Sequence, residues 1–174
     1  MAEEGNIISN LRLDGAQGPV ANGEDTSPAA GIISQYIKDL SVENPNAPQA
    51  YQWQEAPQLD VQFNIAATPV EGELHEVELK VQVTAKVSTG TLYIVDLAYA
   101  GLIGMRNLDE PNMHAFMFAE APRLLFPFAR RVLADAVRDA GYAPLMLEPI
   151  DFNGLYMQQL AERAQTEGTP AGTA

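Results

Sequence analysis

The chain has 174 residues, 47% of them apolar, which is enough for one domain with a hydrophobic core. Its 23 acidic and 10 basic residues give a formal net charge of -13. Such an acidic surface repels the phosphates of nucleic acids and of anionic lipids, so we expect no nucleic acid as a partner. Basic proteins are the partners that it attracts, although the charge can equally serve only to keep the protein soluble.

The sequence contains no cysteine, which excludes disulfides, thiolate catalysis and cysteine metal sites. Its first residues lack the basic start and the apolar run of a signal peptide. Because no stretch of about 18 apolar residues is present, we expect no direct membrane insertion. These features together predict a cytoplasmic protein.

Both ends of the chain have the composition of flexible segments. Gly, Ala, Asn, Asp and Pro dominate residues 1–31, which predicts a flexible N-terminal arm. Residues 166–174 predict a flexible C-terminal tail for the same reason. The folded domain is therefore expected to span residues 32–165. The early apolar residues of the arm form a single cluster, Ile7, Ile8, Leu11 and Leu13.

Four β-strands are predicted after the arm. The first spans about residues 34–42 and ends before a Pro-Asn-Ala-Pro turn at positions 45–48. The second and third alternate apolar and polar residues over 58–65 and 76–87, which is typical of strands with one buried face. A short glycine-containing link at 88–90 joins the third strand to the fourth, which spans about residues 91–102.

The fourth strand is apolar on both faces. Leu92 and Ile94 occupy positions where a strand with one solvated face would carry polar residues. Either a helix or a second subunit covers this face, or the face awaits a docking partner. The pattern leaves both interpretations open.

Helices follow the strands. Pro111, after two acidic residues, marks a helix start, and Asp151 is a good N-cap for the last helix. Pro122 and Pro127 should interrupt or kink the path between them, and Gly141 should end it. The order predicts an α+β fold, in which a four-stranded antiparallel sheet of Greek-key or meander topology precedes C-terminal helices. One such sheet cannot easily cover both of its faces, which predicts self-association.

No catalytic constellation is recognisable. The two histidines, His75 and His114, lack the spacing of a zinc site, so no metal is expected. Gly101 and Gly104 are not followed by the Lys of a phosphate-binding loop, and no Gly-x-Ser-x-Gly elbow is present. We therefore expect a binding protein without cofactors, and not an enzyme.

Three motifs carry a family resemblance. They are YIKDLSVENPNAP at residues 36–48, LLFPFAR at 124–130 and PIDFNGLY at 149–156. In this order they resemble the SecB family of protein-export chaperones, and the likeness runs from about Ser34 to Arg163.

The resemblance implies an ATP-independent chaperone that binds unfolded secretory precursors, keeps them competent for translocation and delivers them to the SecA motor. It also implies a homotetramer, built as a dimer of dimers. The alternation of residues 59–63 alone fits an ordinary intramolecular core equally well. In the family, an apolar groove for unfolded protein would be lined by Leu59, Val61, Phe63, Tyr156 and Leu160.

The resemblance also implies a SecA-binding surface on the sheet. An apolar side chain beside an acid suits a hydrophobic contact rimmed by charge, whereas solvated acids on a sheet are the simpler interpretation. The arm is longer than is usual in the family, and the tail is poor in the acids through which family tails contact SecA, which predicts a weaker second contact. The SecA-binding positions are Asp39, Glu43, Ile94 and Asp96.

Three alternatives remain. The nearest is a SecB-like chaperone dedicated to an antitoxin of a toxin–antitoxin system. The others are a small acidic enzyme with a pocket between sheet and helices, and a purely structural oligomer whose apolar faces are all buried.

Overall fold

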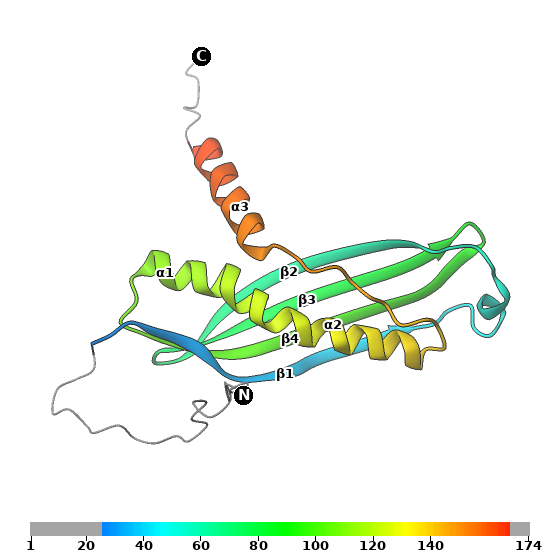
Figure 1. Ribbon diagram of the computed structural model, residues 1–174, viewed down its shortest axis with the longest axis horizontal. Helices are drawn as coiled ribbons and strands as arrows, with labels where there is room; N and C mark the ends of the chain where they lie inside the picture. Colours follow the sequence, from blue (N-terminus) through cyan, green and yellow to red (C-terminus); the bar gives the residue numbers. More distant parts are fainter. Residues whose placement is uncertain (1–25, 168–174) are drawn as a thin grey trace, which may run out of the picture.

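The computed structural model describes residues 26–167, and its centre is a single antiparallel sheet (Figure 1). The strands are β1 (Ala29–Glu43), β2 (Gln58–Glu71), β3 (Leu74–Val87) and β4 (Gly90–Arg106). They lie in the order β1-β4-β3-β2, so β2 to β4 form a meander and β1 pairs with β4 at the far edge. Because the first strand returns beside the fourth, the topology is a Greek key. The predicted α+β fold is confirmed.

Most helical segments follow the sheet in sequence, and one short helix lies between its first two strands. A 3-10 helix, η1 (Gln49–Gln52), lies in the β1–β2 connection. After β4 come α1 (Glu110–Ala115), a π-helical turn η2 (Phe116–Glu120), α2 (Ala121–Asp139) and α3 (Phe152–Glu167). The residue before α1, Asp109, accepts a hydrogen bond from the Asn112 N–H at 2.9 Å. Asp151 likewise accepts from the Gly154 N–H at 2.9 Å. Both predicted helix starts are confirmed.

The path between these starts differs in detail from the prediction. The irregularity expected near Pro122 takes the form of the π-helical turn that precedes it, and Pro122 itself lies in the first turn of α2. Pro127 lies inside α2 without ending the helix. Gly141 has a positive φ of 94° just after α2, as expected of a helix stop.

The sheet extends further at the N-terminal side than predicted. β1 begins at Ala29, so Ala29–Gly31 are strand residues although the sequence placed them in the arm. The first 25 residues of that arm lie outside the described residues. At the other end, Thr166 belongs to α3 and not to the tail, and residues 168–174 lie outside the described part.

The fourth strand also runs beyond its predicted end, past Gly101 and Gly104 to Arg106. A Cβ at Gly101 would meet the Leu125 side chain of α2 at 3.0 Å, so glycine here allows the helix to pack closely.

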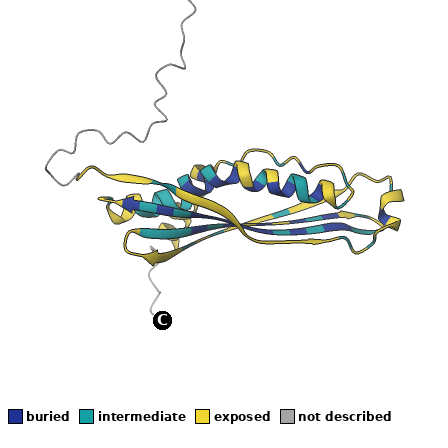
Figure 2. Cartoon of the chain, turned by 90° about the horizontal axis from the view of Figure 1, so that it is seen from below, coloured by how far each residue is buried: buried dark blue, intermediate teal, exposed yellow. Residues whose placement is uncertain are grey.

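One face of the sheet, which we call the covered face, packs against α2 (Figure 2). The alternation of β3 places its apolar residues here and its charged residues on the opposite, open face. The core therefore lies between the covered face and α2. Its fully buried aliphatic members are Val77, Leu79, Val81, Val83, Val95, Leu97, Ile103, Leu125, Leu133 and Val137.

The apolar residues on the open face of β4 are partly covered by side chains of the neighbouring strands. Ala98 and Ala100 lie on the open face yet are buried. By register, Ala100 lies between Tyr36 of β1 and Glu78 of β3. Side chains of the two neighbouring strands bridge over these alanines, so small apolar residues fit beneath them. Ile94 and Leu102 on the same face remain half-buried.

The bridging layer is an ion-pair cluster on the open face. The Lys38 ammonium lies 2.6 Å from the Glu76 carboxylate and 3.0 Å from that of Glu78. The Tyr36 hydroxyl donates to Glu76 at 2.6 Å. The bonds from Lys38 and Tyr36 hold the pKa of Glu76 below its usual range. Burial opposes such a shift at Glu78, but the bonds from Lys38 and Lys80 outweigh it and lower its pKa as well.

Candidate functional site

An aromatic pocket opens where the β1–β2 connection meets the end of α2. Its walls include Tyr51 and Trp53 near η1, Tyr93 of β4 and Tyr142 beyond α2. The Tyr142 ring centroid lies 5.2 Å from that of Tyr51 and 5.1 Å from that of Tyr93. The pocket has a volume of about 380 Å³, which is within the range of sites that bind organic ligands. It can accept one or two large apolar side chains.

Asn44, which directly follows β1, holds the pocket together. Its amide nitrogen donates to the Tyr51 hydroxyl at 2.8 Å and to the Ala140 carbonyl at 3.0 Å. Its amide oxygen accepts from the Tyr142 hydroxyl at 2.8 Å. The Tyr51 hydroxyl itself donates to the Ala140 carbonyl at 2.8 Å. This network orients two of the four rings and ties them to the end of α2.

The pocket is uncharged inside and has a charged rim. Burial raises the pKa of Tyr93 and of Tyr142, so both phenols stay neutral. At the rim, the Glu55 carboxylate accepts from the Ser88 hydroxyl at 2.7 Å and from the Ser88 N–H at 3.2 Å, and these bonds lower its pKa. An apolar group can therefore enter the pocket beside a fixed negative charge.

Strand β2 continues the apolar surface from the pocket. Pro57 lines the pocket, and β2 begins at the next residue. Leu59 and Phe63 lie on the covered side of this edge strand and are 46% and 37% exposed. Val61 between them packs against the core. Among residues 26–167, β3 is the only strand that pairs with β2, so an extended peptide can meet both apolar side chains and the backbone groups of an edge strand.

The five predicted groove residues lie on two elements. Leu59, Val61 and Phe63 lie on β2, whereas Tyr156 and Leu160 lie on α3, which projects away from the sheet in Figure 1. Tyr156 is only 8% exposed, and its hydroxyl lies 2.8 Å from Nδ1 of His114. Leu160 is 38% exposed.

Aromatic rings connect the two groups of groove residues. The Phe126 ring of α2 contacts Phe63 at 6.1 Å and Phe152, the first residue of α3, at 5.6 Å between centroids. The three β2 residues therefore share one surface, and α3 joins it through Phe126 and Phe152.

The four predicted SecA-binding residues lie together on the open face. Glu43 pairs with Ile94, and Asp96 pairs with Ser41, in the register of β1 with β4. Asp39 lies opposite Ala98, one row further along the same face. The Gln82 amide donates to the Asp96 carboxylate at 3.3 Å. The arrangement is a half-buried isoleucine among three carboxylates, which suits a basic partner with an apolar centre.

The sequence analysis missed the aromatic pocket. Tyr51 and Trp53 lie in a turn region without periodicity, and Tyr93 and Tyr142 lie in elements distant in sequence. The available signal was the lone tryptophan beside a proline-rich turn, a residue type enriched at binding surfaces.

Residues 26–167 offer no metal centre and no membrane-spanning helix. No group of three or more His, Asp or Glu side chains there could hold a metal ion. Each helix in this part of the chain is too short or too polar to cross a membrane.

Comparisons with known proteins agree on one family. The family model described as "Preprotein translocase subunit SecB" matches residues 23–163. The chain is 68% identical to the protein-export protein SecB of Novosphingobium aromaticivorans and 62% identical to that of Erythrobacter litoralis, and each alignment covers 100% of both chains.

A solved structure supports the fold. The SecB-like chaperone Rv1957 of Mycobacterium tuberculosis, in complex with a peptide from the HigA1 antitoxin, matches with a TM-score of 0.59 at 18% identity. The match covers 70% of this chain and 90% of that one. Most of the sequence fits the family model and full-length relatives share most of its residues, so the chain belongs to the SecB family of protein-export chaperones.

Proposed function

We propose that this SecB-family chaperone binds unfolded secretory precursors along the aromatic pocket and β2, without ATP, and delivers them to the SecA motor. SecB is a family of chaperones and not a class of enzymes. The observation that carries the proposal is the continuity of apolar surface from the pocket through Pro57 to Leu59 and Phe63. A folded protein hides the side chains that such a surface accepts, whereas an unfolded chain exposes them.

The energetics favour a client that binds at several points. Burying one large apolar side chain contributes about 1.5–3 kcal/mol, which by itself gives only weak binding. A chain that fills the pocket and lies along β2 adds several such contacts, and the avidity of linked contacts raises the affinity by orders of magnitude. Binding then holds the precursor unfolded by mass action.

A chaperone dedicated to one antitoxin is the less favoured alternative. The solved Rv1957 structure holds an antitoxin peptide, but at 18% identity its likeness to this chain concerns the fold. The relatives that share 68% and 62% of their residues with this chain are named protein-export proteins. We therefore favour many export clients over one antitoxin.

Delivery to SecA is proposed to use the open face. Ile94 and the three carboxylates near it lie on the side of the sheet opposite α2. The SecA motor can therefore dock there while a client occupies the covered side. The client and the motor would then meet the same subunit without competing for one surface.

A homotetramer is proposed because apolar surface remains beside α2. Ile37, Leu40 and Val42 lie on the covered side of β1 and are exposed, and Phe128 of α2 is exposed as well. A second copy that packs there would bury these side chains. Light scattering of the purified chain tests the proposal, and a mass of one or two chains would contradict it.

Trp53 makes the client site measurable, because it is the single tryptophan of the chain and it lines the pocket. A tryptophan-free secretory precursor is titrated into the protein, first unfolded by dilution from denaturant and then folded. We expect the Trp53 emission to shift and saturate with the unfolded form alone.

Calorimetry on the same samples separates the possible failures. Heat of binding to the unfolded precursor without a change in Trp53 emission would show that clients bind elsewhere. Equal binding to both forms, or to neither, would contradict the export-chaperone function itself.

A further inference from the structure

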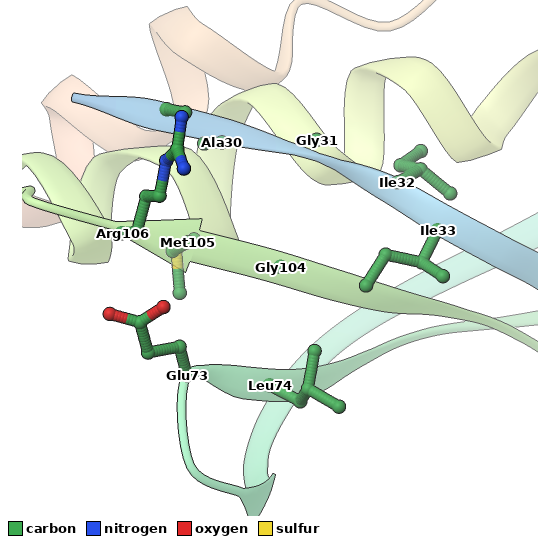
Figure 3. A pocket seen from close by; sticks show the side chains of 10 residues that line it. Ala30, Gly31, Ile32, Ile33, Glu73, Leu74, Gly104, Met105 and Arg106 are labelled. Carbon is green, nitrogen blue, oxygen red and sulfur yellow. The ribbon is translucent and has the colours of Figure 1, made fainter. Parts of the chain in front are cut away.

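An apolar hollow lies at the end of the open face where the chain enters β1 (Figure 3). Its volume is about 300 Å³, and β1, β3 and β4 all contribute to it. Gly31, Gly104 and Leu74 form one row across the three strands. A Cβ at Gly104 would meet the Ile33 side chain at 3.0 Å and that of Leu74 at 3.8 Å, so the missing side chain lets both reach into the same space.

A β-bulge creates the hollow. The register between β1 and β4 shifts between Ile32 and Ser34, and the extra residue, Ile33, turns to the open face. Ile33 is 60% exposed, and among the large apolar side chains of residues 26–167 only Met146 is more exposed. Ile33 lies over backbone that has no side chain at Gly104 and is exposed to water. Covering this apolar surface would lower the free energy.

A segment of the same chain has matching chemistry. Residues 7–13 contain Ile7, Ile8, Leu11 and Leu13, the only cluster of large apolar residues in the first 25 positions. Arg12, between the two leucines, is the only cation among residues 1–31. The hollow is lined mostly by apolar residues, and two exposed charged residues, Glu73 and Arg106, stand at its rim. Glu73 is the one of the two that can attract a cation.

The length of the connection favours this hollow over the aromatic pocket. Thirteen Cα-to-Cα steps separate Leu13 from Thr26. A connection of that length spans about 20 Å on average if it is flexible and about 45 Å when fully extended. The hollow is lined by residues 29–33, which begin three positions after Thr26. The aromatic pocket lies at the other end of β1, whose 15 residues extend about 50 Å. The leucines therefore reach the hollow easily within one chain, whereas only an almost fully extended connection would bring them to the pocket.

We propose that residues 7–13 dock in this hollow on their own chain, with Leu11 and Leu13 against Ile33 and Leu74 and with Arg12 beside Glu73. Because the segment belongs to the same chain, its effective concentration at the hollow is high, so modest apolar contacts are enough for docking. The docked segment covers one end of the open face. A partner that uses the whole face has to displace it, which couples the arm to docking.

The absence of cysteine allows a spin label at a single site. Ser9→Cys in the full chain is labelled with a nitroxide, and the methyl signals of Ile, Leu and Val are recorded in the oxidised and the reduced states. We expect the oxidised label to remove the signals of Ile33 and Leu74, and we expect Leu59 at the far end of the sheet to keep its signal.

The control separates docking from mere tethering. Leu11→Ser with Leu13→Ser keeps the length of the arm and removes its apolar side chains, so the Ile33 and Leu74 signals should largely return. Equal signal loss with and without these substitutions would overturn the proposal, because it would mean that the arm is only tethered nearby.

Two further outcomes would also overturn it. Signal loss centred on Leu59 and Val61 would place the arm on the client surface. Signal loss in a mixture of spin-labelled unenriched chains with isotope-enriched unlabelled chains would place it on another copy. A second variant, Ile33→Ser, tests the hollow itself: the loss at Leu74 should fall to the level of the arm variant.

Discussion

Asn44 is the residue on which the aromatic pocket depends most. Its amide uses both its donor and its acceptor capacity on the pocket, toward Tyr51, Tyr142 and the Ala140 carbonyl. Tyr51 is 7 positions away in sequence, whereas Ala140 and Tyr142 are 96 and 98 positions away, so one side chain joins two distant segments of the wall. Its contribution is therefore both to stability and to the shape of the pocket.

Substituting Asn44→Ala should lower the free energy of unfolding by about 1–3 kcal/mol, because part-buried hydrogen bonds are lost. It should also weaken binding of an unfolded client, since Tyr51 and Tyr142 are no longer oriented. Denaturant unfolding and calorimetry measure the two effects. Asn64→Ala, an exposed asparagine on the open face, is the matched control and should change neither. A pocket variant with unchanged client affinity would argue against the pocket as the client site.

The Glu76 carboxylate gives the open face a defined pH dependence. Its pKa is lowered in the folded protein by Lys38 and Tyr36, so its contribution to stability is present above the pKa of the unfolded chain. That contribution is lost as the pH falls through the lowered folded pKa. The pKa of Lys38 is raised, so its contribution is present below its unfolded value and is lost only in strong alkali.

Glu76→Gln should therefore destabilise the protein at pH 7 by about 0.5–1 kcal/mol, the size expected of a partly exposed ion pair. The difference from the original protein should shrink as the pH is lowered below about 4, where the carboxylate of the original protein also becomes protonated. Thermal or denaturant unfolding at a series of pH values measures it. A difference that is independent of pH would show that the cluster acts by packing and not by charge.

At the scale of elements, the two ends of β2 differ in their distance from the aromatic pocket. Its first half carries Leu59 and Phe63 beside the aromatic pocket, whereas Val70 near its end is 58% exposed and far from the pocket. All three are apolar side chains on the same edge strand. The strand therefore contains its own control for a test of client binding.

Leu59→Thr with Phe63→Thr should reduce the affinity for an unfolded precursor by about tenfold or more, because two apolar contacts are lost. Threonine preserves the preference for a strand, so the sheet should remain intact. Val70→Thr is the matched substitution and should leave the affinity unchanged. Calorimetric titration with the unfolded precursor measures both. An equal effect of the two changes would mean that the precursor binds to β2 non-specifically.

At the scale of the whole molecule, the sheet separates two surfaces. The covered side carries α2, the aromatic pocket and the β2 side chains, and the open side carries the acidic residues around Ile94. Because successive side chains of a strand point to opposite faces, a substitution on the open side can leave the covered side intact. The two proposed partners can thus be tested one at a time.

Asp39→Asn with Asp96→Asn should weaken SecA binding by about tenfold at low salt and reduce its salt dependence, since rim charges steer association. Binding of the unfolded precursor should not change. Glu71→Gln with Asp139→Asn removes the same charge away from this surface and serves as the control. Loss of both partners together, or of neither, would contradict the assignment of these residues to SecA.

The local features of the fold could be predicted from sequence because their causes lie within a few residues. The alternation of Leu59, Val61 and Phe63 reports a strand with one apolar face, and the capping carboxylates of Asp109 and Asp151 report helix starts. The three family motifs added the expected function. They could do so because the chain keeps most of the residues of its relatives.

Tertiary structure alone decided which distant elements became neighbours. Strand order placed β1 beside β4, which brought Glu43 next to Ile94 and laid Tyr36 and Lys38 over Ala100. The aromatic pocket needs Tyr51, Tyr93 and Tyr142 from three elements, and the bulge at Ile33 appears only in the pairing register. Periodicity in a sequence reports burial along one element. Pairing and packing between elements depend on the free energy of the whole assembled sheet, so they cannot be predicted from any single segment.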